Sequence, residues 1–86
     1  MKSSWFVYIL RCNDNSLYTG ITTDLDRRLE EHNHGKKAAA YTRSRRPVKL
    51  VYSEKCANRS IASSRESALR TLPKREKERL LMKSEG

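Results

Sequence analysis

The sequence holds few of the residues that build metal clusters, disulfide frameworks or membrane spans. Its two cysteines, Cys12 and Cys56, lie far apart and form no C-x-x-C pair, so no zinc-type ligand spacing is present. One disulfide between them stays open, but this usage favours reduced thiols and a cytoplasmic location. No apolar run approaches the ~18 residues of a membrane-spanning helix, so we expect no membrane partner.

Acidic residues are scarce relative to basic ones. The chain of 86 residues carries 19 Lys or Arg against 10 Asp or Glu, a formal net charge of +9. Most of the excess lies between residues 35 and 60, where Glu54 is the one acid. A basic field this dense attracts polyanions and predicts a nucleic acid, DNA or RNA, as the partner. A solvated surface that only keeps a small protein soluble is the competing interpretation.

Six basic residues of this segment are candidates for phosphate contacts. They share a position in or beside a connector without apolar periodicity, and nothing near them resembles a base-reading element. They are Lys36, Lys37, Arg43, Arg45, Arg46 and Lys49. We therefore expect them to hold a nucleic-acid backbone without reading its sequence.

The chain contains no internal repeat and no low-complexity linker, which indicates one domain over residues 1–86. Two strands, 4–12 and 16–23, are joined by turn residues, and a third strand spans 47–54 with Val48, Leu50 and Tyr52 on one face. Helices are expected over 22–35, 58–72 and 73–84, with a helical turn at the alanines after residue 37. The order β-β-α-β-α-α predicts an α+β fold: a three-stranded, mainly antiparallel sheet flanked by helices.

The first two strands contain two tyrosines whose placement depends on the hairpin register. If residues 13–15 form the loop, Tyr8 faces Gly20 and Tyr18 lies diagonal to Tyr8 on the same face. A slip of one residue would send Tyr18 to the opposite face. Taken singly, each tyrosine is an ordinary packing aromatic.

The helix over 22–35 has two polar residues on its inner stripe. Leu25, Arg28, Leu29 and His32 recur at i, i+3, i+4 and i+7, which places them on one face. Thr23 with Asp26 matches a capping box, Gly35 suits the position after the helix, and Arg27, Glu30 and Glu31 are expected to point elsewhere.

The helix over 58–72 contains a carboxylate beside its apolar stripe. That stripe comprises Ile61, Ala62, Ala68, Leu69 and Leu72, and Asn58 can cap the helix. Glu66 lies one turn from Ala62. An ion pair of Glu66 with Arg70 at i,i+4 is the plain structural alternative.

The five polar residues that the pattern places near buried faces suit phosphodiester hydrolysis. A phosphodiester is anionic, so catalysis must supply positive charge, activate water and stabilise the leaving oxygen. Arg28 offers a guanidinium fork, Glu66 can hold one divalent ion, and Tyr8, Tyr18 or His32 can move a proton. The presence of these residue types in one chain is consistent with a nuclease.

The chain resembles the GIY-YIG nuclease family, and its small single-domain bacterial branch in particular. "FVY" (residues 6–8) stands for the first motif half and "YTG" (18–20) for the second. "DLDRRLEEH" resembles the family's arginine helix and "RESALR" its metal-carboxylate helix, so that the resemblance covers residues 5–82. Phe6 and Val7 replace the Gly and Ile of the family name, and Thr19 replaces an Ile.

The resemblance implies a role for each site residue. Tyr8 would accept a proton, directly or through water, and Tyr18 would hydrogen-bond the phosphate or the water. Arg28 would stabilise charge on the phosphate, and His32 would assist proton transfer or orient Tyr8. Glu66 would bind a single Mg²⁺ or Mn²⁺ that contacts the phosphate and the leaving 3′ oxygen. We see no late asparagine of the kind some branches use, which implies a metal shell completed by water.

These features predict a metal-dependent DNA endonuclease that serves repair or recombination. With no second domain to select a site, its sequence specificity is expected to be low, directed by DNA structure or lent by a protein partner. We expect a monomer or weak dimer. A basic nucleic-acid-binding module that does not cleave explains the charge equally well.

Overall fold

The computed structural model describes residues 4–85, whose seven elements follow the predicted order. The strands are β1 (Trp5–Arg11), β2 (Leu17–Thr22) and β3 (Lys49–Cys56); the helices are α1 (Leu25–His34), α2 (Ala40–Arg43), α3 (Arg59–Thr71) and α4 (Lys74–Glu85). The short α2 is the expected helical turn at the alanines. Among the residues described, no helix is long and apolar enough to cross a membrane.

The sheet has the order β2-β1-β3, and both pairings are antiparallel, as predicted. Tyr8 pairs with Gly20, and the Cys12 amide donates to the Ser16 carbonyl at 2.8 Å, which is the register expected for a loop over 13–15. Asn15 takes the left-handed conformation (φ 70°) that a tight turn requires and that Asn tolerates well. The turn therefore fixes which face each tyrosine occupies.

A bulge in β3 overturns one sequence prediction. Ile9 pairs with Tyr52, but the next residue, Leu10, pairs with Leu50, so Val51 is an extra residue on β3. The insertion reverses the alternation of β3 at that point. Val48 packs on the same face as Leu10, whereas Tyr52 packs on the face of Ile9, so the expected single face does not exist.

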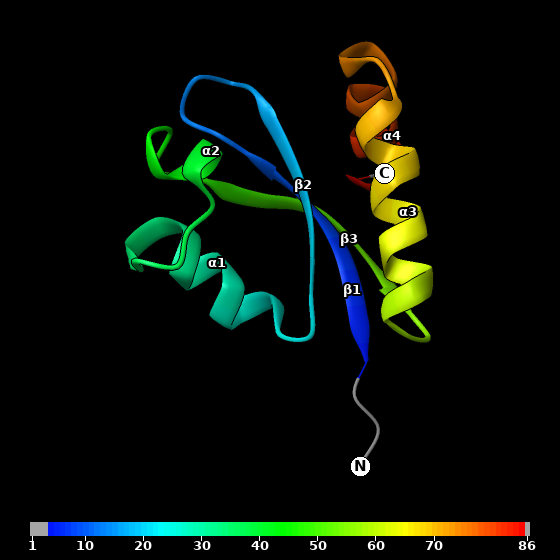
Figure 1. The fold of residues 1–86 in the computed structure, drawn as a ribbon. Coiled ribbons are helices and arrows are strands. Elements are labelled where there is room, and N and C mark those ends of the chain that lie inside the picture. The colour runs from blue at the N-terminus through cyan, green and yellow to red at the C-terminus, as the bar shows by residue number, and fades with distance from the viewer. Residues whose placement is uncertain (1–3, 86) are drawn as a thin grey trace.

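Helices cover both faces of the sheet, with α1 and α2 on one side and α3 and α4 on the other (Figure 1). The core on the α3 side contains Val7, Ile9, Cys56, Ala62, Leu69 and Leu81. The core on the α1 side contains Tyr8, Leu10, Cys12 and Val48, with Tyr18, Leu25 and Leu29 packed against it. Because successive residues of β1 serve opposite cores, all of Val7–Leu10 is buried.

The ends of α1 are held by specific contacts. The N-cap is Asp24, whose side chain accepts from the Arg27 amide at 3.0 Å, so the expected Thr23–Asp26 capping box is wrong. Gly35 follows the helix as predicted. Arg46 donates to the carbonyls of His32 (2.5 Å), Glu31 (3.2 Å) and Gly35 (2.5 Å), and the Gly35 amide also donates to the Glu31 carbonyl, so that the end of the helix is held by one arginine side chain.

Helix α3 buries a narrower stripe than its sequence predicted. Asn58 caps it as expected, accepting from the Ile61 amide at 2.9 Å. Ala62 and Leu69 are buried, but Ile61 and Ala68 are exposed. Glu66 falls between the two buried residues, so α3 carries it on the side that packs against the sheet.

Candidate active site

The two motif tyrosines lie on the same face of the β1–β2 hairpin, with ring centroids 6.5 Å apart. The Tyr8 ring crosses over Gly20: a Cβ added at Gly20 would stand 2.6 Å from the Tyr8 oxygen and 3.2 Å from the Tyr18 ring. Any other residue at position 20 would displace the phenol. Tyr8 is only 2% exposed, whereas Tyr18 is half-buried.

His32 joins these tyrosines through a chain of hydrogen bonds. Its Nε2 is 2.8 Å from the Tyr8 hydroxyl, and its Nδ1 is 2.7 Å from the Thr42 hydroxyl, which itself donates to the Ala39 carbonyl at 3.1 Å. Because the one hydroxyl hydrogen of Thr42 goes to that carbonyl, Thr42 accepts from Nδ1–H. Nε2 is then the acceptor, and the Tyr8 hydroxyl donates to it.

Burial sets the protonation of both partners. Desolvation, followed by the positive charges of Arg28 and Arg46, lowers the pKa of His32 to about 4, and the charge of Glu31 opposes this shift. The pKa of Tyr8 is raised to about 12, mainly by desolvation and further by the negative charges of Tyr18 and Glu66. The hydrogen bond and the positive charge of Arg28 act in the opposite direction and lower this pKa. At neutral pH the structure therefore holds a neutral imidazole against a neutral phenol.

Arg28 reaches this site from the inner stripe of α1, as predicted. Its guanidinium donates to the Glu31 carboxylate at 2.8 Å and to the Lys37 carbonyl at 3.0 Å. Glu31 is consequently turned towards Arg28, which differs from the expectation that it points elsewhere. The ion pair orients the arginine beside the phenol of Tyr8.

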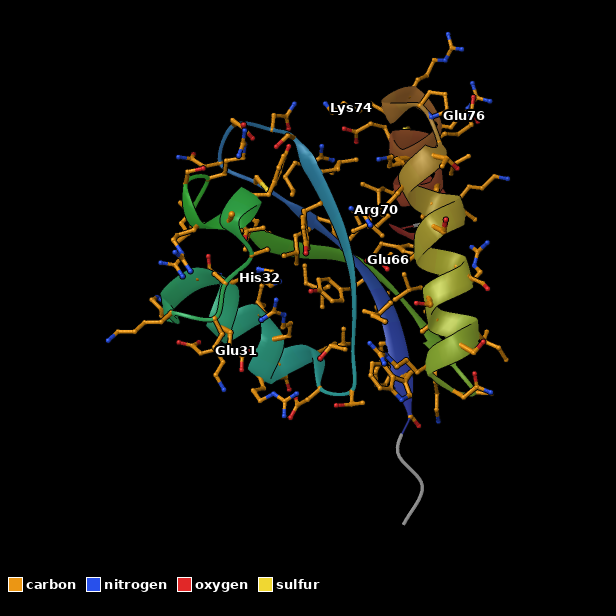
Figure 2. The ribbon with its side chains drawn as sticks, in the orientation of Figure 1. Glu31, His32, Glu66, Arg70, Lys74 and Glu76 are labelled. Atoms are coloured by element: carbon orange, nitrogen blue, oxygen red, sulfur yellow. The ribbon has the colours of Figure 1, made fainter. Side chains whose placement is uncertain are left out.

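Glu66 approaches from α3, the helical layer on the opposite side of the sheet. Figure 2 shows Glu66 and Arg70 extending from α3 towards the sheet, while His32 extends from α1 on the other side. The Glu66 carboxylate is near enough for its charge to raise the Tyr8 pKa. Its contact with Arg70 is long, at 4.0 Å, and its side chain is 22% exposed. The carboxylate is thus placed near the tyrosines without a close ion-pair partner among the described residues.

The donor set around Glu66 suits only a sparsely held metal ion. Within residues 4–85 no group of three or more His, Cys, Asp or Glu side chains is arranged to hold a metal. Mg²⁺ is often bound by one or two carboxylates together with waters and substrate phosphates. A single half-buried carboxylate fits that mode and does not fit an all-protein cage.

The six basic candidates divide into two groups. Lys36, Lys37 and Lys49 are exposed. The three arginines make internal contacts: Arg46 holds the end of α1, Arg43 donates to the Lys36 carbonyl at 2.8 Å, and Arg45 binds Asp14 at 2.9 Å. Phosphate contacts by all six stay a prediction, but the structure gives these arginines a first role in fixing the connector.

Sequence reasoning missed two residues of this site. Thr42, fully buried, sets the tautomer of His32, and Tyr41 stacks on Tyr18 with ring centroids 5.9 Å apart. Both belong to α2, a four-residue helix inside a basic connector. No periodic signal marks so short an element, and a threonine has no chemical signature of its own.

Comparison with known proteins identifies the family. A profile of the GIY-YIG catalytic domain matches residues 4–79. The chain belongs to the GIY-YIG family. It is 55% identical over 84 residues to a UPF0213 protein of Desulfotalea psychrophila, covering 98% of this chain and 76% of that one. It is 43% identical to a UPF0213 protein of Natronomonas pharaonis over the full length of both.

Two solution NMR structures of relatives share the fold. The UPF0213 protein of Bacillus halodurans superimposes with a TM-score of 0.59 at 43% identity, over 92% of this chain and 83% of that one. A protein from E. faecalis gives a TM-score of 0.64 at 39% identity, over 98% and 88% of the two chains. A GIY-YIG catalytic domain implies a nuclease, and the tyrosine hairpin described above carries the two motif halves.

The low pKa of His32 predicts that stability depends on pH. The imidazole has a pKa of about 4 when folded and 6.5 when exposed, so between these values the unfolded chain binds a proton that the folded chain does not. This contribution to stability is present above pH 6.5 and is lost as the pH falls towards 4. Urea unfolding should give a free energy about 2 kcal/mol lower at pH 5 than at pH 7.

Exposed His34 supplies the matched control for this measurement, because its side chain is 72% exposed. His32→Gln should remove most of the difference between pH 7 and pH 5, whereas His34→Gln should retain it. A difference that survives His32→Gln would contradict the buried, neutral state of His32.

Proposed function

We propose that the protein is an endonuclease that hydrolyses DNA phosphodiester bonds with the help of one Mg²⁺ or Mn²⁺ ion. The observation that supports this best is the convergence of Arg28, His32 and the charge of Glu66 on the phenol of Tyr8. A purely structural tyrosine needs one hydrogen-bond partner, and His32 alone would satisfy it. Membership of a nuclease family supports the same reaction class.

In the proposed reaction, Tyr8 acts as its phenolate. Loss of its proton to solvent at pH 7 costs about 7 kcal/mol for a pKa of about 12, whereas transfer to His32 with a pKa of about 4 would cost about 11 kcal/mol. His32 is therefore too weak a base to keep the proton, and it orients the phenol instead. The phenolate then takes a proton from the water that attacks phosphorus.

Arg28 would stabilise both the phenolate and the phosphate. Tyr8 is buried, so side chains around it would have to move before water could reach its oxygen, and Arg28 would turn from Glu31 and Lys37 towards the phosphate. Tyr18, half-buried beside it, would hydrogen-bond the phosphate or that water. The positive charge of the guanidinium lowers the pKa of a neighbouring phenol, which offsets part of the ionisation cost.

Glu66 would hold the divalent ion, which supplies positive charge to the phosphate and to the leaving 3′ oxygen when bound. The carboxylate fits this role through its partial burial and its long contact with Arg70. Without a bound cation, the negative charge of Glu66 would repel a phosphate that Arg28 binds nearby.

The basic surface would bind the DNA backbone without reading bases. Exposed Lys36, Lys37 and Lys49 are the most available of the predicted contacts. Low sequence specificity, a protein partner that selects the site, and a role in repair or recombination stay predictions, as do RNA as a substrate, a cytoplasmic location and a monomeric or weakly dimeric state. A basic binding module without activity remains the competing function.

Nicking of supercoiled plasmid DNA in Mg²⁺ separates the two functions. Tyr8→Phe should slow nicking by about 10²- to 10⁴-fold, because it removes the group that moves the proton. Glu66→Ala should abolish nicking, because it removes the metal ligand. Both variants should keep wild-type DNA affinity in a filter-binding assay.

Tyr52→Phe and Glu30→Ala are the matched controls. Tyr52 contacts Glu54 and lies on the other face of the sheet, and Glu30 is exposed on α1. Both controls should nick at wild-type rates. If wild-type protein leaves duplex, branched and single-stranded DNA uncut with either metal ion, the binding module is the correct function.

The rate of cleavage should rise with pH. With the pKa of Tyr8 at about 12, the phenolate fraction grows about tenfold per pH unit below that value. Single-turnover rates measured from pH 6 to 9 should therefore increase throughout, by up to tenfold per unit. A flat profile with chemistry rate-limiting would show that Tyr8 is not the base.

A further inference from the structure

A cleft beside the site crosses from α2 over β2 to the α3–α4 layer. Its volume is about 240 Å³, and it is lined by Leu17, Tyr18, Thr19, Tyr41, Arg70 and Lys77. The cleft shares Tyr18 with the candidate site. Arg70 lies one helical turn beyond Glu66, and Figure 2 shows both side chains extending from α3 towards the sheet. The cleft is therefore a continuation of the place proposed for the scissile phosphate.

Two polar groups of this cleft lack partners within the described part of the chain. Lys77 is half-buried, yet no carboxylate whose side chain the structure describes forms an ion pair with it. Thr19 is only 5% exposed, and its hydroxyl is buried without a hydrogen-bond partner. A half-buried lysine without a counter-ion in this cleft favours the entry of an anionic group, which would supply the missing opposite charge.

The other wall of the cleft is aromatic and firmly positioned. Tyr41 stacks on Tyr18, with planes 27° apart, and the Arg45 guanidinium lies 3.9 Å from the Tyr41 ring centroid. Asp14 of the hairpin turn binds Arg45 at 2.9 Å. Aromatic surface opposite two cations suits a sugar attached to a phosphate.

We propose that this cleft binds the phosphate and sugar of the nucleotide next to the one whose phosphate Arg28 contacts. Lys77 and Arg70 pair with the phosphate, and Tyr18 and Tyr41 contact the sugar. This subsite depends on the proposed function, and it adds a second contact point for the nucleic-acid strand that the candidate site binds.

The size of the cleft favours part of a polymer as its occupant. Sites for whole small ligands usually measure about 300–1,000 Å³, and this cleft is smaller. Two contact points one nucleotide apart would also set the path along which the nucleic-acid strand crosses β2. Such positioning can orient the scissile bond without reading any base.

Fluorescence anisotropy with a labelled single-stranded 12-mer in EDTA tests the subsite without cleavage. Lys77→Gln should weaken binding about fivefold to tenfold, and the salt dependence of binding should fall by about one phosphate contact. Lys83→Gln is the matched control, because Lys83 is an exposed lysine of the same helix outside the cleft. It should leave affinity within about twofold of wild type. Lys77→Arg should restore affinity.

Amide chemical shifts locate the contact. Titration with the 12-mer should shift the amides of residues 17–19 in wild type, and the same shifts in Lys77→Gln should need about fivefold to tenfold more 12-mer. Without DNA, the spectrum of Lys77→Gln should match that of wild type away from the substituted residue. Equal weakening by Lys77→Gln and Lys83→Gln, or unshifted amides at 17–19, would overturn the subsite. Because EDTA prevents metal-dependent cutting, a protein that passes this test but never nicks DNA would retain the subsite and lose the proposed nuclease function.

Discussion

The hydrogen bond between the Tyr8 hydroxyl and Nε2 of His32 is the interaction on which the rest of the site depends. It joins the central strand β1 to α1 across the core, and it is possible only because Gly20 has no side chain to displace the phenol. Thr42 fixes the direction of this bond from the second side of the imidazole. Arg46 anchors the end of α1 that carries His32. Residues of β1, β2, α1 and α2 therefore together fix the position of the Tyr8 phenol.

The site lies where two helical layers meet around the edge strand β2. Tyr8, Tyr18, Arg28 and His32 belong to the α1 side, whereas Glu66 belongs to α3, whose buried residues pack on the opposite face. Arg28 approaches the face that carries the tyrosines, whereas Glu66 extends from the helix that packs on the other face. The narrow edge of a three-stranded sheet lets the charge of Glu66 act on Tyr8 from the other layer. A larger sheet would separate the two.

The features that sequence predicted are those set by short-range rules. Loop length alone placed Tyr8 opposite Gly20, and helical periodicity placed Arg28 and His32 on the inner face of α1. The bulge at Val51 was not predictable, because no residue in β3 marks it and only the pairing with β1 defines it.

Contacts between segments distant in sequence were also beyond prediction. From the sequence, Arg45 and Arg46 were predicted to be available for phosphate contacts, yet in the structure each binds a group on another segment. Thr42 gains its role only because α2 folds against His32. A charge map of the chain therefore overstates how many of its arginines are free to meet a phosphate.

The protonation state of His32 tests the central interaction most directly. Nitrogen-15 NMR of the labelled imidazole at pH 7 should show a neutral ring with the proton on Nδ1 and an unprotonated, hydrogen-bonded Nε2. That signal should persist until the pH approaches the pKa of about 4. An imidazolium at pH 7, or a neutral ring protonated on Nε2, would contradict the donation from Tyr8 on which the account rests.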